Sequence, residues 1–140
     1  MMARLRSLWS DNQGAAAVEF VFAVPVLVTI IWGIFQLSLV LEAQAGVQQA
    51  LGEGARLATV YDPSTGASKT DTAILSKITS SKFGTGSGTF YTACPDTCIS
   101  TDSTAKTKTI TVTYKQSTNF LFFAGPDVTI KKSKVVYYPN

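Results

Sequence analysis

Histidine is absent from the 140-residue chain, and cysteine and charged residues are scarce. Without histidine, the chain lacks the commonest general base and the commonest metal ligand of proteins. No glycine-rich phosphate loop followed by lysine precedes a helix pattern, and the formal net charge of +3 comes from dispersed lysines rather than a dense basic patch. The composition therefore predicts a protein that is not an enzyme, has no cofactor or metal, and does not bind nucleic acid.

Charge is missing altogether from residues 20–41, which lie between Glu19 and Glu42. As a helix, this run of about 22 residues extends roughly 33 Å, enough to cross a bilayer core of about 30 Å. Its apolar side chains occur on every side, which is typical of spanning helices rather than helices that lie on a membrane surface. Pro25 predicts a local kink or loosened turn. We therefore predict one transmembrane helix.

The charges flanking this run predict its orientation. Arg4 and Arg6 precede it, whereas Glu42 follows it and the next basic residue is Arg56. Basic residues are enriched on the cytoplasmic side of membrane spans. The N-terminus is therefore expected in the cytoplasm and the C-terminus outside it.

Glu19 separates three interpretations of the apolar run. A cleaved secretory signal would use Ala43-Gln44-Ala45 as its small-residue site, but the run is longer than the usual apolar region of such signals. An uncleaved membrane anchor fits the length and the flanks, yet neither interpretation gives a role to Glu19, an ionisable group that is costly beside a membrane. In the third interpretation, a cytoplasmic-side peptidase cuts between Gly14 and Ala15. The new α-amino group then lies one helical turn from Glu19 and can pair with a carboxylate of its own or a neighbouring chain.

The motif that runs from Gly14 through Glu19 to Phe20, together with three later features, resembles the TadE/TadG-like family of pseudopilins, the minor pilins of the Tad (Flp) type IV pilus system. The later features are Pro25, Gly33-Ile34-Phe35-Gln36 and Gly52-Glu53-Gly54-Ala55-Arg56. The resemblance is close over residues 13–60 and covers the C-terminal part only in its general pattern of strands. Gln36 stands where many relatives carry an acidic residue, so a role for charge there is not transferred.

The resemblance implies that a prepilin peptidase cleaves after Gly14, with Gly14 and Glu19 as recognition residues and Ala15 as the new N-terminus. The implied location is the bacterial inner membrane, with the C-terminal part periplasmic or extracellular and the subunit incorporated into a pilus. The implied partners are the peptidase, other Tad pilins or pseudopilins, the inner-membrane assembly platform and membrane lipid. The implied function is pilus assembly or adhesion.

The helix pattern continues beyond the membrane to about residue 61. Apolar or small residues form one stripe at helical spacing, whereas Glu42, Gln49, Glu53 and Arg56 fall mainly on the other side. Glycines within a helix cost about 1 kcal/mol each relative to alanine, so we expect either local flexibility or close approach by the sheet or a partner helix. The stripe consists of Val47, Leu51, Ala55 and Ala58, and the glycines are Gly46, Gly52 and Gly54.

The organisation predicted is a leader over residues 1–14, a long helix over 15–61, and a small α+β domain over 62–140. A short helix over 71–82 is expected, capped by Thr70 or Asp71, with an apolar edge that packs on the sheet or the long helix. Alternating residues predict strands over 107–114 and 128–138, and 90–92 as a third, in a small antiparallel sheet laid on the outer half of the long helix.

An aromatic cluster over residues 120–123 lies between the two clear strands. The favoured interpretation is that these side chains fill the core beneath the strands. The alternative is an exposed patch for a partner or the membrane surface.

Cys94 and Cys98 are separated by three residues that include a turn-forming Pro-Asp pair. Zinc would need two further ligands, and a thioredoxin-like pair has two intervening residues rather than three. We predict a small structural disulfide, which requires an oxidising compartment and agrees with an external C-terminal domain.

Overall fold

The computed structural model describes residues 12–62, 67–81 and 88–138. Most of the predicted leader therefore lies outside the described residues. These described residues form two helices and six strands in an α+β arrangement: α2 (Asn12–Thr59), β1 (Tyr61–Asp62), β2 (Ala67–Ser68), α3 (Asp71–Thr79), β3 (Thr89–Phe90), β4 (Cys98–Asp102), β5 (Thr107–Gln116) and β6 (Val128–Tyr137).

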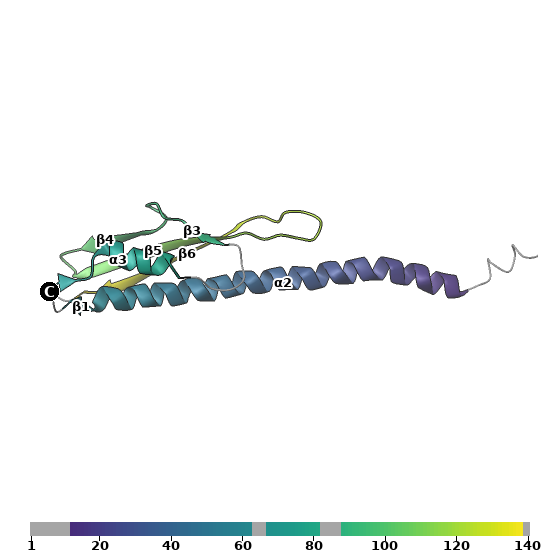
Figure 1. The fold of residues 1–140 in the computed structure, drawn as a ribbon, viewed down its shortest axis with the longest axis horizontal. Coiled ribbons are helices and arrows are strands. Elements are labelled where there is room, and N and C mark those ends of the chain that lie inside the picture. The colour runs from purple at the N-terminus through teal and green to yellow at the C-terminus, as the bar shows by residue number, and fades with distance from the viewer. Residues whose placement is uncertain (1–11, 63–66, 82–87, 139–140) are drawn as a thin grey trace, which may run out of the picture.

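The long helix α2 contains 48 residues, which corresponds to roughly 72 Å. It is continuous through Pro25, whose carbonyl accepts a hydrogen bond from the Thr29 hydroxyl at 2.7 Å. Its N-terminal half projects away from the folded domain, whereas its C-terminal half lies beneath the sheet (Figure 1). Two environments along one helix follow directly from this arrangement.

The main sheet is antiparallel and has β5 at its centre. β6 pairs with β5 along the whole length of both strands, from Thr107 opposite Tyr137 to Gln116 opposite Val128. The other edge of β5 is shared by β4 and β3, in that order along the strand from its start. The sequence missed β4, because Cys98–Asp102 has only one strongly apolar residue and no clear alternation. The separate two-residue pairing of β1 with β2 forms a small ladder after α2.

The short helix α3 begins at the predicted cap, since the Thr70 hydroxyl oxygen accepts a hydrogen bond from the Ala73 backbone N–H at 3.4 Å. It ends at Thr79, three residues earlier than predicted. At its N-terminus, Asp71 forms an ion pair of 2.7 Å with Lys108 of β5, so the first turn of α3 is fixed to the sheet. A carboxylate at this position is also favoured by the helix dipole.

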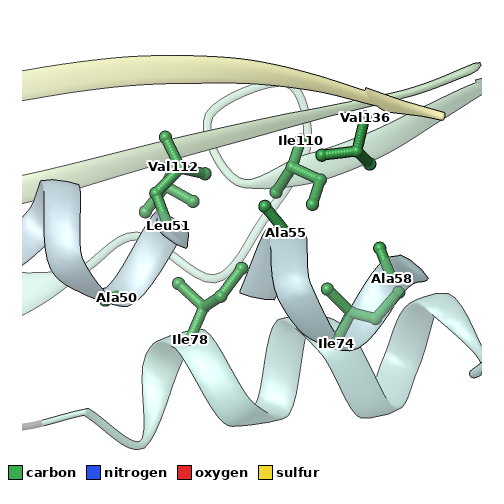
Figure 2. Close-up of a cluster of buried hydrophobic side chains, with 9 residues drawn as sticks. All are labelled: Ala50, Leu51, Ala55, Ala58, Ile74, Ile78, Ile110, Val112 and Val136. Carbon is green, nitrogen blue, oxygen red and sulfur yellow. The ribbon is translucent and has the colours of Figure 1, made fainter. Parts of the chain in front are cut away.

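The hydrophobic core lies between α2, α3 and the sheet (Figure 2). The predicted stripe of α2 is confirmed, because all four of its residues are buried. Ile74 and Ile78 of α3 fill the space on one side of the stripe, and Ile110, Val112 and Val136 of the sheet cover the other. A second cluster, nearer the middle of α2, joins Ala43 and Val47 to Tyr114 and Ile130.

The three glycines of the outer half of α2 do not share one role. A Cβ atom at Gly54 would collide with the Ile78 side chain, so this glycine permits the close packing of α3 on α2. A Cβ at Gly52 would meet nothing within 4 Å. The close approach expected from the sequence therefore occurs at Gly54, where the neighbour is the chain's own short helix.

The aromatic cluster does not fill the core, so the favoured interpretation of residues 120–123 was wrong. Leu121, Phe122 and Phe123 are 49%, 74% and 61% exposed. The β5–β6 loop that carries them extends along α2 toward the N-terminal half of that helix (Figure 1). The space beside the stripe is filled instead by Ile74 and Ile78 of α3.

Candidate functional site

The predicted processing residues all lie in the first turns of α2, where their side chains are exposed. Ala15 and Glu19 are four positions apart in the sequence, so they occupy the same face of the helix, one turn apart. Gly14 has nothing within 4 Å of the position a Cβ would take. Since the Gly14–Ala15 bond lies inside a helix, a peptidase would have to unwind this turn, and glycine is the residue that favours such unwinding.

Within the part of the chain that the structure describes, Glu19 has no ion-pair partner. The surrounding surface from residue 14 to 32 is exposed throughout and almost entirely apolar. α2 is long and apolar enough to cross a membrane, and the apolar window is not covered by other parts of the protein. A single membrane-spanning anchor fits this helix. An ion-pair partner for the Glu19 carboxylate would therefore have to come from outside the described residues.

Two side chains of α2 bind the β5–β6 loop. The Trp32 indole N–H donates to the Asn119 carbonyl at 2.8 Å, and the Gln36 side-chain oxygen accepts from the Asn119 backbone N–H at 3.4 Å. Gln36 is 7% exposed although it lies inside the uncharged run. A neutral amide at this position supplies a hydrogen-bond acceptor without burying a charge. Sequence reasoning missed this site, although an isolated glutamine in an apolar helix was a signal.

The segment between the two cysteines is hydrogen-bonded to Thr113 of β5. The Thr113 hydroxyl donates to the Asp96 carbonyl at 2.7 Å, and the Thr113 backbone N–H donates to the hydroxyl oxygen of the buried Thr97 at 3.3 Å. Cys94 and Cys98 are free thiols here. A hydrogen bond with the Cys98 thiol, together with burial, raises the pKa of the Cys94 thiol. The disulfide remains a prediction for an oxidising compartment.

The secretory-signal interpretation conflicts with the fold. Cleavage after Ala45 would separate Ala43 from Val47, although both belong to one buried cluster inside an unbroken helix. Signal cleavage would also remove the part of α2 that binds the β5–β6 loop. Two residues of the apolar run, Trp32 and Gln36, thus contact the folded domain.

In a comparison with protein families, residues 14–56 match the family described as TadE-like protein. The matched segment begins at Gly14 and covers both the exposed apolar half of α2 and most of its buried stripe. No curated protein and no solved structure matches the chain.

Proposed function

We propose, from the premise that residues 14–56 form a TadE-like segment, that this protein is a minor pilin or pseudopilin of a Tad (Flp) type IV pilus or a related secretion system. A prepilin peptidase cleaves it after Gly14, and the mature subunit takes part in pilus assembly or adhesion. The coarser statement, a Tad pilus-associated protein anchored by one helix, follows from the family and from the apolar half of α2.

The observation that carries the proposal is the position at which the family match begins. The family match starts at Gly14, the residue at which the sequence motif predicts the cut. From that residue to Trp32, the side chains of α2 are exposed and almost entirely apolar. A peptidase acting at this position would leave a subunit whose first residues are already helical and apolar.

Glu19 supports assembly by charge pairing. Once Ala15 carries a free ammonium, that group and the Glu19 carboxylate occupy one face of the helix. In an assembly of parallel helices, the ammonium of one subunit can satisfy the carboxylate of its neighbour. A wrong axial register leaves an unpaired charge in an apolar layer, which costs several kcal/mol. The pair therefore acts as a register device between subunits.

The partners follow from this arrangement. The peptidase and the assembly platform contact the inner-membrane segment, and other Tad pilins or pseudopilins pack on the exposed face of α2. The orientation with the N-terminus in the cytoplasm rests on Arg4 and Arg6. The folded domain then lies in the periplasm or outside the cell, in contact with membrane lipid before assembly.

Mass spectrometry of the protein from its native host tests the cleavage. We expect a mature N-terminus at Ala15. The variant Gly14→Val should keep its leader and still insert in the membrane, whereas Gly33→Val should be processed normally, because Gly33 also has open space around it but lies far from the cut. An intact Met1 in the wild-type protein would support the alternative function, an uncleaved membrane-anchored interaction domain.

A second experiment separates cleavage from assembly. Glu19→Gln removes the charge but keeps the size and the hydrogen-bonding capacity of the side chain, so it should be incorporated into pili or partner-pilin complexes much less than wild type. Glu42→Gln is the matched control, since Glu42 is exposed at the other end of the uncharged run. Equal incorporation of the two variants would contradict the register device, even if both are cleaved.

A further inference from the structure

The β5–β6 loop has an unusual composition for a loop of a small domain. Residues 117–126 carry no charge and include three phenylalanines and a leucine. Charges return at the two ends of this segment, where Lys115 and Asp127 form an ion pair of 2.7 Å across the hairpin. The loop therefore has a charged neck and an uncharged, aromatic tip.

The tip lies beside the part of α2 that is predicted to cross the membrane. Its contacts are with Trp32 and Gln36, which are nine and five residues before the end of the uncharged run at Leu41. At 1.5 Å per residue, the tip lies roughly 8 to 14 Å below the level of Leu41. Water-exposed loops normally stay outside this level, whereas this one extends past it.

Several backbone polar groups of the tip are paired within the protein. Phe120 and Phe123 exchange two backbone hydrogen bonds, of 2.9 and 3.3 Å, and the Gly125 N–H donates to the Thr118 carbonyl at 3.1 Å. The carbonyl of Pro126, which has no N–H, accepts from the Thr118 hydroxyl at 2.7 Å. The N–H and carbonyl of Asn119 are bound by α2, as described above. Internal pairing of this kind lowers the free-energy cost of taking these groups out of water.

Side chains at the tip are arranged to present apolar surface outward. The rings of Phe120 and Phe123 stack with centroids 5.0 Å apart, while Leu121 and Phe122 project at the turn and are exposed. Between the hairpin and α2 lies a largely apolar open groove of about 260 Å³, lined by Gly33, Gln36, Leu37 and Val40 on the helix and by Thr118, Phe120, Pro126 and Val128 on the hairpin. The exposed tip and this groove continue the apolar surface of the helix.

We propose that residues 120–123 insert into the outer leaflet of the membrane at the level of Trp32 and Gln36, as a second membrane contact beside α2. Lipid is the occupant favoured by the structure, because the apolar surface of the tip is continuous with that of the span. The charged neck also marks where the hairpin leaves the water. This inference requires that α2 spans a membrane but does not depend on cleavage of the leader.

One consequence concerns the depth of the helix. If the outer boundary of the hydrocarbon core lies near Phe35 rather than Leu41, the span covers residues 15–35, about 21 residues or roughly 32 Å. Trp32 then lies close to the interface, where tryptophan is enriched. Glu19 lies one turn inside the opposite boundary. The hairpin thus sets the depth at which α2 crosses the bilayer.

The test uses the full chain with Cys94→Ser and Cys98→Ser, reconstituted in phosphatidylcholine–phosphatidylglycerol vesicles. An environment-sensitive nitrobenzoxadiazole label is attached to a single new cysteine at one of three exposed positions: Phe122→Cys at the tip, Val28→Cys in the span, and Ser133→Cys in β6. Lipids carrying doxyl quenchers near the headgroup or deep in the acyl chain report the depth of each label.

We expect the label at residue 122 to emit at shorter wavelength than the label at 133 and to be quenched best by the shallow doxyl lipid. If the label at 122 behaves like that at 133 while the label at 28 is quenched, the tip does not enter the bilayer and the inference is wrong. If the shielding at 122 disappears as the protein is diluted in lipid, a second copy covers the tip and the inference is also wrong. An unquenched label at 28 would overturn the span itself, and with it the proposed function.

Discussion

The two halves of α2 share one continuous helix but differ in what surrounds them. Val28, in the N-terminal half, is 42% exposed, whereas Val47, in the C-terminal half, is completely buried. The N-terminal half is apolar on all sides, while the C-terminal half has one apolar stripe with polar residues opposite. The sheet and α3 therefore cover the half of α2 that carries the apolar stripe and leave the other half uncovered.

This contrast gives each half its own source of stability. The C-terminal half gains from area removed from water within the chain, at about 25 cal/mol per Å². The N-terminal half can obtain the same gain only from lipid or from other helices. Its exposed apolar surface is therefore the part of the protein that needs partners, and the buried stripe is the part that does not.

The largest difference in unfolding free energy is expected between two leucine truncations, one in each half of α2. Leu51→Ala removes a side chain that is 4% exposed and should lower the free energy of unfolding of the outer domain by about 2 to 5 kcal/mol. Leu27→Ala, at a position 56% exposed, should change it by less than about 0.5 kcal/mol. Chemical unfolding in detergent micelles, followed by circular dichroism, measures both. Similar losses at the two sites would mean that the halves are not energetically distinct.

A second comparison lies within the C-terminal half. Gly54→Ala places a methyl group against the buried Ile78 side chain and should destabilise the domain by about 1 to 3 kcal/mol. Gly52→Ala has open space and should stabilise the helix by about 1 kcal/mol, since alanine is the better helix former. The same unfolding measurement gives the sign of each change. Opposite signs are expected, and stabilisation by Gly54→Ala would show that α3 is not tightly packed there.

The sequence predicted the elements whose pattern is local and regular. The apolar run, the stripe and the alternation over residues 107–114 follow from helical and strand periodicity, so α2 and β5 were expected almost at their observed bounds. The Thr70 cap was also readable, because a hydroxyl before an apolar helix pattern is a local signal.

The features that could not be predicted from the sequence depend on contacts between residues far apart in the chain. β4 has little alternation of its own and forms because β5 offers it an edge, as in the pairing of Cys98 with Thr111. The aromatic tip was assigned to the core because aromatic residues usually lie there. Its position beside the span is visible only in the structure, where the Trp32 indole N–H donates to the Asn119 carbonyl and the Asn119 N–H donates to the Gln36 side-chain oxygen, across more than 80 positions of sequence.

The cysteine pair lies away from the buried stripe, so its loss should cost less than the loss of a stripe residue. Closing a loop with three intervening residues contributes about 2 kcal/mol or less. We expect Cys94→Ser to lower the unfolding free energy of the oxidised protein by no more than this amount. Alkylation of the native protein without reductant, followed by mass spectrometry, shows whether the bridge exists. Two alkylated thiols in that sample would contradict the predicted disulfide.

The smallest effect is expected at the neck of the hairpin, where the two environments of the molecule meet. The Lys115 ammonium, and after it the Ser117 hydroxyl, lowers the pKa of the Asp127 carboxyl, while a hydrogen bond to Asp127 raises the pKa of Lys115. The stabilisation from Asp127 is therefore complete above the ordinary pKa of aspartate and is lost as the pH falls through the lowered value. That from Lys115 is lost only as the pH rises through its raised value.

Hydrogen exchange of the segment between residues 117 and 126 provides the measurement. In the wild-type protein, protection should be constant around neutral pH and should fall on acidification, after allowing for the intrinsic pH dependence of exchange. Asp127→Asn should show a lower neutral plateau and no such acid-linked fall. Because both partners are partly exposed, the change should be slight. If Asp127→Asn left the protection unchanged at every pH, the tip would be held in place by Trp32 and Gln36 without help from the charged neck.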